Sequence, residues 1–477
     1  MSYFEKTQVA AADSPSVDAF GRWRVSNPVT IAEHSFEYDE RPVWFDQSVM
    51  ESAGIAHNAT TRQCVMTIST TAPNAITGTL EVTGTSNPRT ATFSALKTFA
   101  TGDVIVTEFG VVYEIVTGTT DTVFSVNGLY NTPAGSTATW RGSCAVMRQK
   151  IHNVYEKGKS QLVKITGLFG AAVENVTRQM GYYDYYNGVF LMQTNTAVSI
   201  VLRSYITGAV VDTAVAQSSW NIDAMDGSGP SGITLDLQYG VILMIDMQFL
   251  GVGRVRVGFD IGGMIYYVHQ FVHANATASI PYWQAASMPC GWEIFNTDTS
   301  AGATMSAICM EVESEGGSLA PNHQNFSISN TADVSATTSR THLLSIRPAQ
   351  QFNSLPNRIS FVVDMSNIVV GLNAVLVEIL YNSTLTGGSW AAVNGTYSAM
   401  EYNSGASLSV AGIVVDAFFA SVGGVGGKGI QTSDSINNQY PITLDMFGAN
   451  PDVITIVATA LTGTSNCRAS INWEEIH

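Results

Sequence analysis

Short runs of β-forming residues, each bounded by turn-forming residues, recur along the whole chain and constrain its fold more than any other feature. Helical periodicity is scarce by comparison. Representative runs are QLVKITGLFG, GVFLMQ, AVSIVLRSYITGAVVDTAV, ITLDLQYGVILMIDMQFL and VLVEILYNS. This pattern is typical of sandwiches and barrels, so the sequence predicts an all-β protein with two jelly-roll-like antiparallel β-sandwich domains and a small inserted β module.

The segment FLGVGRVRVGFDIGGMIYYVHQF, residues 249–271, begins with a glycine pair that resembles a phosphate-binding loop. The dinucleotide fingerprint is not met, because Gly258 comes two positions late, and no G-K-[ST] follows. Strict alternation instead predicts a half-buried strand, a turn at Gly262-Gly263 and a second strand. The residues expected on the buried face are Val255, Val257, Phe259 and Ile261, with Arg254 and Arg256 facing outward and Gly251 and Gly253 at bends.

The charge content limits the classes of partner. Charged residues make up 13% of the 477 residues, about half the usual share, so the surface must be covered largely by uncharged polar side chains. The net charge of -16 and the absence of any run of Lys or Arg argue against a nucleic-acid partner. With 45% hydrophobic residues, the chain can build packed cores.

The five cysteines are far apart, odd in number and free of any C-x-x-C spacing, which predicts buried free thiols rather than a zinc or redox site. They are Cys64, Cys144, Cys290, Cys309 and Cys467. The start MSYFEKTQVAAADS lacks the apolar run of a signal peptide. The most apolar segment, YGVILMIDMQFLG, is interrupted by Asp246 and is shorter than the ~18 residues of a membrane span. We therefore expect a soluble protein made in the cytoplasm, with no cofactor.

Changes in composition suggest the domain boundaries. Residues 79–140 are rich in Thr and short strands, and we expect them to form the inserted module. Residues 313–326, ESEGGSLAPNHQNF, have the polar, glycine-rich composition of a linker. The expected order is an N-terminal sandwich from residues 1–78 and 141–312, the module, the linker, and a C-terminal sandwich at 327–477.

Several segments together resemble a family of virion structural proteins of tailed bacteriophages. They are DAFGRWRVSNPVT, KGKSQLVKITGLFG, DGSGPSGITLDL, FLGVGRVRVGFDIGGMIYYVHQFVHANA, MPCGWEI, SIRPAQQFNSLPNR, VLVEILYNSTLTGGSW and SINWEEI. The resemblance covers most of the chain outside the insertion. It implies a virion protein, present in several copies on the capsid, neck, tail or fibre, and made in the host cytoplasm. A trimer is the oligomer that the resemblance favours.

Three groups of residues are candidate sites. His269 and His273 would lie about 13 Å apart along a strand, too far for one metal ion. The tyrosines of YYDYYNG, residues 182–188, could stack on sugar rings, but packing in a core or interface is the favoured interpretation. The carboxylates Asp223, Asp226, Asp236 and Asp246 could serve glycan cleavage, but two of them lie in a turn-rich loop.

No G-x-S-x-G motif occurs. The sequence therefore names no catalytic, cofactor-binding or metal-binding residue, and it predicts a protein without enzymatic activity. The expected partners are further copies of the chain and other virion proteins. The alternatives are a receptor-binding or glycan-cleaving tailspike or fibre protein, whose partner would be a host surface glycan, and a bacterial sugar-binding module. No repeat of ~20–50 residues supports a β-helical spike.

Overall fold

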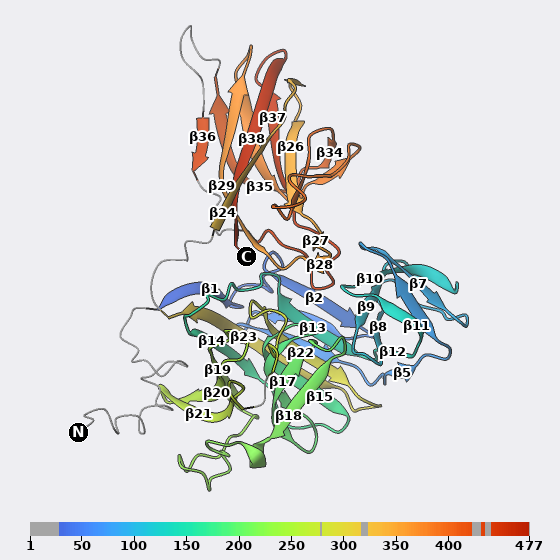
Figure 1. The fold of residues 1–477 in the computed structure, drawn as a ribbon, viewed down its shortest axis with the longest axis vertical. Coiled ribbons are helices and arrows are strands. Elements are labelled where there is room, and N and C mark those ends of the chain that lie inside the picture. The colour runs from blue at the N-terminus through green and yellow to red at the C-terminus, as the bar shows by residue number, and fades with distance from the viewer. Residues whose placement is uncertain (1–27, 277–278, 316–322, 422–430, 435–439, 477) are drawn as a thin grey trace, which may run out of the picture. The chain divides into compact units, whose positions relative to one another are not determined.

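The computed structural model describes residues 28–276, 279–315, 323–421, 431–434 and 440–476. The chain divides into two compact units, Met1–Gly84 with Pro88–Ala320 and Thr85–Asn87 with Pro321–His477. The described residues contain many antiparallel strands, one short 3-10 helix at Gln217–Ser219 and no α-helix (Figure 1). The predicted all-β class with antiparallel sandwiches is confirmed. The resemblance segment DAFGRWRVSNPVT lies largely outside the described residues.

Two sheets build the main sandwich of the first unit. The first is eight-stranded, in the order β21 (Met264–Phe271), β20 (Val255–Ile261), β19 (Gly240–Met247), β14 (Gln161–Leu168), β23 (Ala303–Ser314), β4 (Gln63–Ile68) and β3 (Gly54–Asn58), and β1 (Val29–Ser35) also pairs with β23. The second is seven-stranded, in the order β18 (Val211–Ala216), β17 (Val198–Ser204), β16 (Gly188–Gln193), β15 (Val176–Tyr183), β22 (Cys290–Asn296), β13 (Cys144–Gln149) and β2 (Phe45–Met50).

The twelve-residue strand β23 organises the first sheet. Along one side it pairs with β14, and along the other side β1 and β4 share its length. Side chains from both sheets meet in one core, which includes Ile165 and Met310 from the first sheet and Trp292 from the second. These side chains are almost completely buried, so the two sheets form the sandwich that alternating apolar strands predict.

The hairpin predicted for residues 249–271 is present. Strands β20 and β21 pair antiparallel and turn at Gly262 and Gly263, whose φ angles of 66° and 83° suit a two-residue hairpin turn. Val255, Val257 and Phe259 are buried in the core. The expectation that Arg256 faces water is wrong, because its side chain is fully buried on the opposite face of the sheet. The alternation of polar and apolar residues predicts on which face of the sheet a side chain lies. It does not predict whether other residues cover that face.

A third sheet occupies the region where an insertion was predicted. Its order is β11 (Thr132–Ser136), β6 (Leu80–Thr83), β7 (Arg89–Phe93), β10 (Val123–Asn127), β9 (Val112–Ile115), β8 (Val104–Thr107), β12 (Ala138–Trp140) and β5 (Asn74–Ala75). The rings of Phe93, Phe99 and Phe124 lie 5.3–5.8 Å apart and pack it internally. The two points at which this segment leaves and rejoins the sandwich are adjacent. A Cβ atom added at Gly142 would lie 2.4 Å from the backbone of Ala72.

The second unit is a smaller sandwich with two main sheets and two short hairpins. One sheet has the order β24 (His323–Ser329), β38 (Ser465–Ile476), β29 (Ser360–Val370) and β36 (Gln431–Asp434), and β25 (Val334–Ala336) also pairs with β38. The other has the order β32 (Ala391–Ala392), β33 (Met400–Asn403), β26 (Thr341–Pro348), β37 (Ile454–Ala460), β30 (Val375–Tyr381) and β35 (Ile413–Ala420). The hairpins are β27 (Gln351–Phe352) with β28 (Leu355–Pro356), and β31 (Thr384–Thr386) with β34 (Ser407–Val410).

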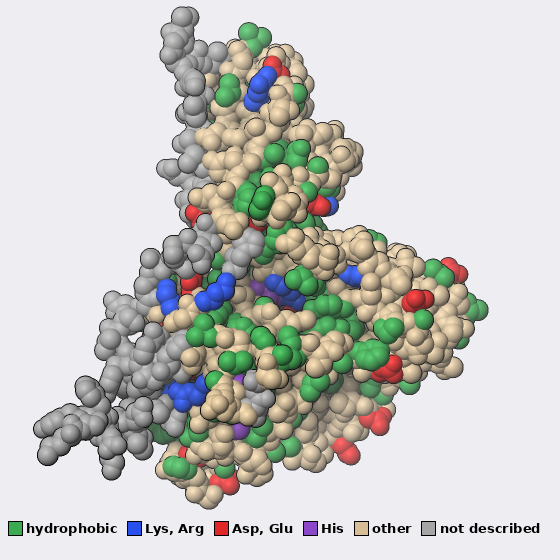
Figure 2. Space-filling view, in the orientation of Figure 1, with side chains coloured by type: hydrophobic (Ala, Val, Ile, Leu, Met, Phe, Trp, Pro, Cys, Tyr) green, Lys and Arg blue, Asp and Glu red, His purple; other side chains and the backbone are tan. Residues whose placement is uncertain are grey.

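The domain boundaries predicted from composition stay predictions, and residues 316–322 of the proposed linker lie outside the described residues. Figure 2 shows a surface made mainly of uncharged polar side chains and backbone, with few charged groups between hydrophobic ones. Within the part of the chain that the structure describes, no helix has the length and hydropathy needed to cross a membrane.

Candidate functional site

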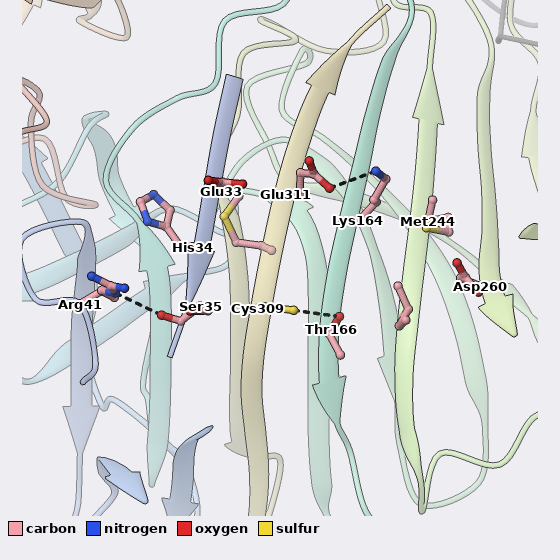
Figure 3. A pocket seen from close by; sticks show the side chains of 12 residues that line it. Glu33, His34, Ser35, Arg41, Lys164, Thr166, Met244, Asp260, Cys309 and Glu311 are labelled. Atoms are coloured by element: carbon pink, nitrogen blue, oxygen red, sulfur yellow. Dashed lines mark hydrogen bonds and ion pairs between the residues drawn. The ribbon is translucent and has the colours of Figure 1, made fainter. Parts of the chain in front are cut away.

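The candidate site is a groove on the outer face of the first unit's eight-stranded sheet. Side chains alternate across a strand, so Lys164 and Thr166 of β14 point away from the core residues Val163 and Ile165. The groove has a volume of about 580 Å³ and crosses β1, β23, β14, β19 and β20. Figure 3 shows its lining side chains on one face of these neighbouring strands.

The register of the sheet arranges the lining in two rows. The first row contains Glu33, Glu311, Lys164 and Met244, each opposite the next across a strand pair. The second row contains Ser35, Cys309, Thr166, Ile242 and Asp260. Charged side chains therefore lie mainly in one row, and smaller or apolar side chains mainly in the other.

Lys164 is the central charge of the groove. Its Nζ lies 3.0 Å from Oε2 of Glu311 and 2.8 Å from Oε2 of Glu313. Partial burial lowers the pKa of Lys164, but the hydrogen bonds to these two carboxylates raise it by more. Burial likewise raises the pKa of Glu311, but the hydrogen bond and the charge of Lys164, together with further side-chain hydrogen bonds, lower it by more. Lys164 and Glu311 are therefore charged at neutral pH.

Glu33 faces Glu311 across the β1–β23 pair and completes a pair of carboxylates. Glu311 accepts a hydrogen bond from the Thr30 hydroxyl at 3.3 Å, in addition to that from Lys164. Glu33 is exposed at the rim of the groove. Together they offer carboxylate oxygens beside an ammonium group, an arrangement that can accept and donate hydrogen bonds to a polyhydroxylated or cationic ligand.

The rest of the groove adds a thiol and a neutral histidine. Cys309 is half-buried and its Sγ lies 3.4 Å from Oγ1 of Thr166, whereas the other four cysteines are buried free thiols, as predicted. His34 packs on Trp44 with ring centroids 4.8 Å apart. Burial, followed by the charge of Arg41, lowers the pKa of His34 to about 4, so its imidazole is neutral at pH 7.

The carboxylates considered from the sequence do not meet in one place. Asp223 accepts the backbone N–H groups of Met225 and Ser231, both at 2.8 Å. Asp226 and Asp236 likewise accept backbone N–H groups two residues further on. These three stabilise turns. Burial raises the pKa of Asp223, but its hydrogen bonds lower it by more, so it stays ionised.

Asp246 lies in a different environment, at the end of the outer face of the eight-stranded sheet. Its Oδ2 is 2.6 Å from Nη2 of Arg256 and accepts the Tyr267 hydroxyl at 2.7 Å. Its Oδ1 accepts the Ser160 hydroxyl at 3.0 Å. All these groups are buried, so the cluster forms a structural ion pair beyond the groove.

His269 lies in β21, His273 lies two residues beyond the end of this strand, and both take part in aromatic packing. His273 stacks on Tyr282 at 3.9 Å, and Phe271 lies between the two histidines along the chain. His269 Nδ1 accepts the backbone N–H of Asn221 at 3.2 Å. No group of three or more His, Cys, Asp or Glu in the described ranges is arranged to hold a metal ion.

The tyrosines of residues 182–188 pack inside the protein. Tyr182 and Tyr183 are fully buried, and Tyr185 and Tyr186 nearly so. The guanidinium of Arg148, itself buried, lies 4.2 Å from the ring centre of Tyr185. Tyr186 packs edge-on against Tyr130, which lies between β10 and β11, with ring centroids 4.8 Å apart. The cluster therefore has no face open to a sugar ring.

Sequence reasoning missed the groove itself. Glu33, Lys164 and Glu311 come from three distant parts of the chain, and the register of β1, β23 and β14 brings them together. Each lies in a run that alternates polar and apolar residues, which marks an outward position. No local motif indicates that these three outward positions are neighbours.

Comparisons with known proteins find no matching family model and no matching curated protein. Similar solved structures include a glycosyl hydrolase family protein from Mycobacterium fortuitum, with 9% identity over 60% of this chain and 99% of that one, at a TM-score of 0.32. A Bacteroides ovatus GH16 protein from a mixed linkage glucan locus has 6% identity over 59% and 99%, at 0.29. A legume lectin-like domain from Entamoeba histolytica has 8% identity over 60% and 98%, at 0.24.

These matches correct one prediction. Glycoside hydrolases among the similar structures contradict the expectation that the chain has no enzymatic activity, and that expectation is withdrawn. That expectation was based on the absence of a catalytic motif from the sequence. Catalytic carboxylates can lie on neighbouring strands without forming any local sequence motif. At these TM-scores the matches do not assign an activity or a ligand to this chain.

Proposed function

We propose that the chain is a structural component of a tailed-bacteriophage virion that works as a homo-oligomer, a trimer being the expected form. The observation that supports this proposal most directly is strand β35. It is the last strand in the path of its sheet and pairs with β30 alone among the described strands. Its sequence, IVVDAFFA, is apolar except for Asp416.

Three large apolar side chains of β35 are open to water in the single chain. Phe419 is 62% exposed, and Ile413 and Val414 are 42% and 43% exposed. A long apolar edge strand is a site where a further chain can add, and monomeric proteins usually protect such edges. Burial against another subunit would cover this edge, which agrees with the few charges on the surface and with the resemblance to virion proteins.

Light scattering on the full chain at micromolar concentration tests assembly. We expect an oligomer whose stability rises with salt, because subunits of charge -16 repel each other and about 0.5 M salt screens that repulsion. Phe419→Ser should weaken the oligomer, whereas Leu96→Ser, at an even more exposed position in the loop that follows β7, should not. Monomer alone at high salt contradicts self-assembly. Antibody labelling of virions then tests the location.

The groove supports a second candidate, a receptor-binding or glycan-cleaving spike protein. Its carboxylate pair, Glu33 and Glu311, lies on an open sheet face beside Lys164. Two carboxylates across a glycosidic bond are the usual machinery for its hydrolysis. The assay is the release of reducing ends from the surface polysaccharide of the host bacterium. Activity should disappear in Glu311→Gln and persist in Glu81→Gln, a control on the third sheet. No release by the wild-type chain excludes cleavage.

A further inference from the structure

The second unit contains a cavity that is independent of the groove. It has a volume of about 810 Å³ and lies where β38 begins, at the opposite end of that strand from Ile476. Its walls come from the start of β38, the end of β29 and the turns that follow β24 and β29. One wall is polar and the other is apolar.

The polar wall is an ion pair with unused hydrogen-bonding groups. Nε of Arg468 lies 2.6 Å from Oδ1 of Asp333, and the two side chains are 55% and 50% exposed. This contact leaves the two terminal NH2 groups of the guanidinium and the second carboxylate oxygen without a described protein partner. The side chains of Thr464 and Asn466 add a hydroxyl and an amide to the same wall. Donors and acceptors are therefore fixed side by side.

The apolar wall consists of Val369 and Leu372, which are 58% and 70% exposed. Leu372 stands on a turn that hydrogen bonds hold in place. Its backbone N–H and that of Asn373 donate to the Ser465 hydroxyl at 3.3 and 3.1 Å. The Asn373 amide donates to the carbonyl of Thr464 at 2.8 Å. A pre-formed turn that presents an apolar side chain loses little entropy on binding.

We infer that this cavity, hereafter the β38 cavity, binds a neutral saccharide. A sugar ring offers vicinal hydroxyls that can both donate and accept, and these match the free oxygen of Asp333 and the free NH2 groups of Arg468. Its C–H face suits the aliphatic side chains of Val369 and Leu372. The charges of Asp333 and Arg468 cancel, and the whole chain is acidic, so neither the site nor the surrounding field favours an anionic ligand.

The inference does not depend on self-assembly or on the groove. The experiment uses saturation-transfer difference NMR on the full chain with four tetrasaccharides: maltotetraose, cellotetraose, mannotetraose and, as the anionic member, tetragalacturonate. Each is added at about 1 mM, where even weak binding is detected. We expect at least one neutral tetrasaccharide to bind and tetragalacturonate to bind less well.

Variants place the binding in the β38 cavity. Arg468→Ala and Leu372→Ser should each lower the affinity by about tenfold or more, which corresponds to the loss of a charge-assisted hydrogen bond or of an apolar contact. Arg340→Ala is the matched control, because it removes an Arg–carboxylate pair with Glu378 elsewhere in the same unit. Binding that is lost in Glu33→Gln and kept in Arg468→Ala would place the saccharide in the groove and would overturn the inference.

Three further results overturn the inference. They are the absence of binding by every neutral tetrasaccharide, equal binding by the wild type and by both cavity variants, and a preference for tetragalacturonate. None of them affects the light-scattering test of assembly, so failure of the saccharide site is distinguishable from failure of the proposed function. Thermal unfolding of each variant checks that it is folded.

Discussion

Asp246 and Arg256 form an ion pair with 2.6 Å between Oδ2 and Nη2, and neither side chain has any exposure to solvent. They face each other across the β19–β20 pair. The Tyr267 hydroxyl donates to the same carboxylate oxygen, and its ring lies 4.1 Å from the guanidinium carbon. Breaking such a pair leaves a charge in a medium that cannot solvate it.

We therefore predict that Asp246→Ala lowers the free energy of unfolding of the first unit by about 3–5 kcal/mol. Asp333→Ala breaks the exposed pair with Arg468 and should cost less than about 1 kcal/mol. Urea unfolding followed by tryptophan fluorescence measures both. A cost for Asp246→Ala as small as that of the exposed pair would contradict the buried-charge argument.

Acidification should destabilise the first unit before its carboxylates titrate. Burial lowers the pKa values of His34 and His269 to about 4, from an ordinary value of 6.5. The unfolded chain therefore takes up protons first, and this stability is present above pH 6.5 and is lost as the pH falls from 6.5 towards 4. The melting temperature should decrease across that window, measured in steps from pH 7 to pH 4.5.

A variant isolates the histidine contribution. Protonation of His269 at Nδ1 would remove the acceptor of the Asn221 N–H, so His269→Gln should flatten the decrease in melting temperature between pH 6.5 and 5. The carboxylates of Glu311 and Asp223, whose pKa values are lowered, contribute in the same direction but at lower pH. If the melting temperatures of the variant and the wild type depend identically on pH, His269 does not contribute to the loss of stability.

Removal of the third sheet should leave a folded, soluble and oligomeric protein. The chain ends to be joined are adjacent, since Ala72 and Gly142 touch and Ser143 donates to the carbonyl of Thr71 at 2.9 Å. Replacement of residues 74–140 by a few glycines tests this by circular dichroism and light scattering. A lower melting temperature is expected, because Tyr186 loses its contact with Tyr130. Loss of all soluble protein would contradict an independent module.

Asp416 should limit uncontrolled pairing through the edge of β35. A charge within an apolar edge strand is a common protection against aggregation, and here it is the single charge of the strand. We predict that Asp416→Val increases the aggregated fraction at 37 °C, measured by turbidity, while Asp121→Val, at an exposed position in the turn before β10, does not. Equal turbidity of the two variants would assign no protective role to Asp416.

The sequence predicted the fold class because period-two alternation is a local property. It placed the β20–β21 hairpin correctly, including its Gly262-Gly263 turn and the buried Val257. It failed for Arg256, since alternation does not reveal whether a second layer covers a face. A polar residue in an alternating strand can lie on a solvent-exposed face of the sheet or belong to a buried ion pair.

The candidate sites could not be predicted because their residues meet through long-range register. Glu33 and Glu311 become neighbours only when β1 aligns with β23, and Asp333 reaches Arg468 across β25 and β38. Acidic residues that are close in sequence, such as Asp223 and Asp226, stabilise turns by accepting hydrogen bonds from backbone N–H groups. Proximity along a β-rich chain says little about proximity in a sheet.

The shared pairing of β23 by β1, β4 and β14 has a consequence during synthesis. Among the described strands β1 pairs with β23 alone, and the hydroxyl of Thr30 in β1 donates to Glu311 of β23, 281 positions later, so β1 leaves the ribosome long before its partner exists. At a translation rate of about 5–20 residues per second, β1 waits on the order of 10–60 s with unpaired backbone. The third sheet, whose strands all lie within residues 74–140, can close during that interval and shorten the length of chain left unfolded.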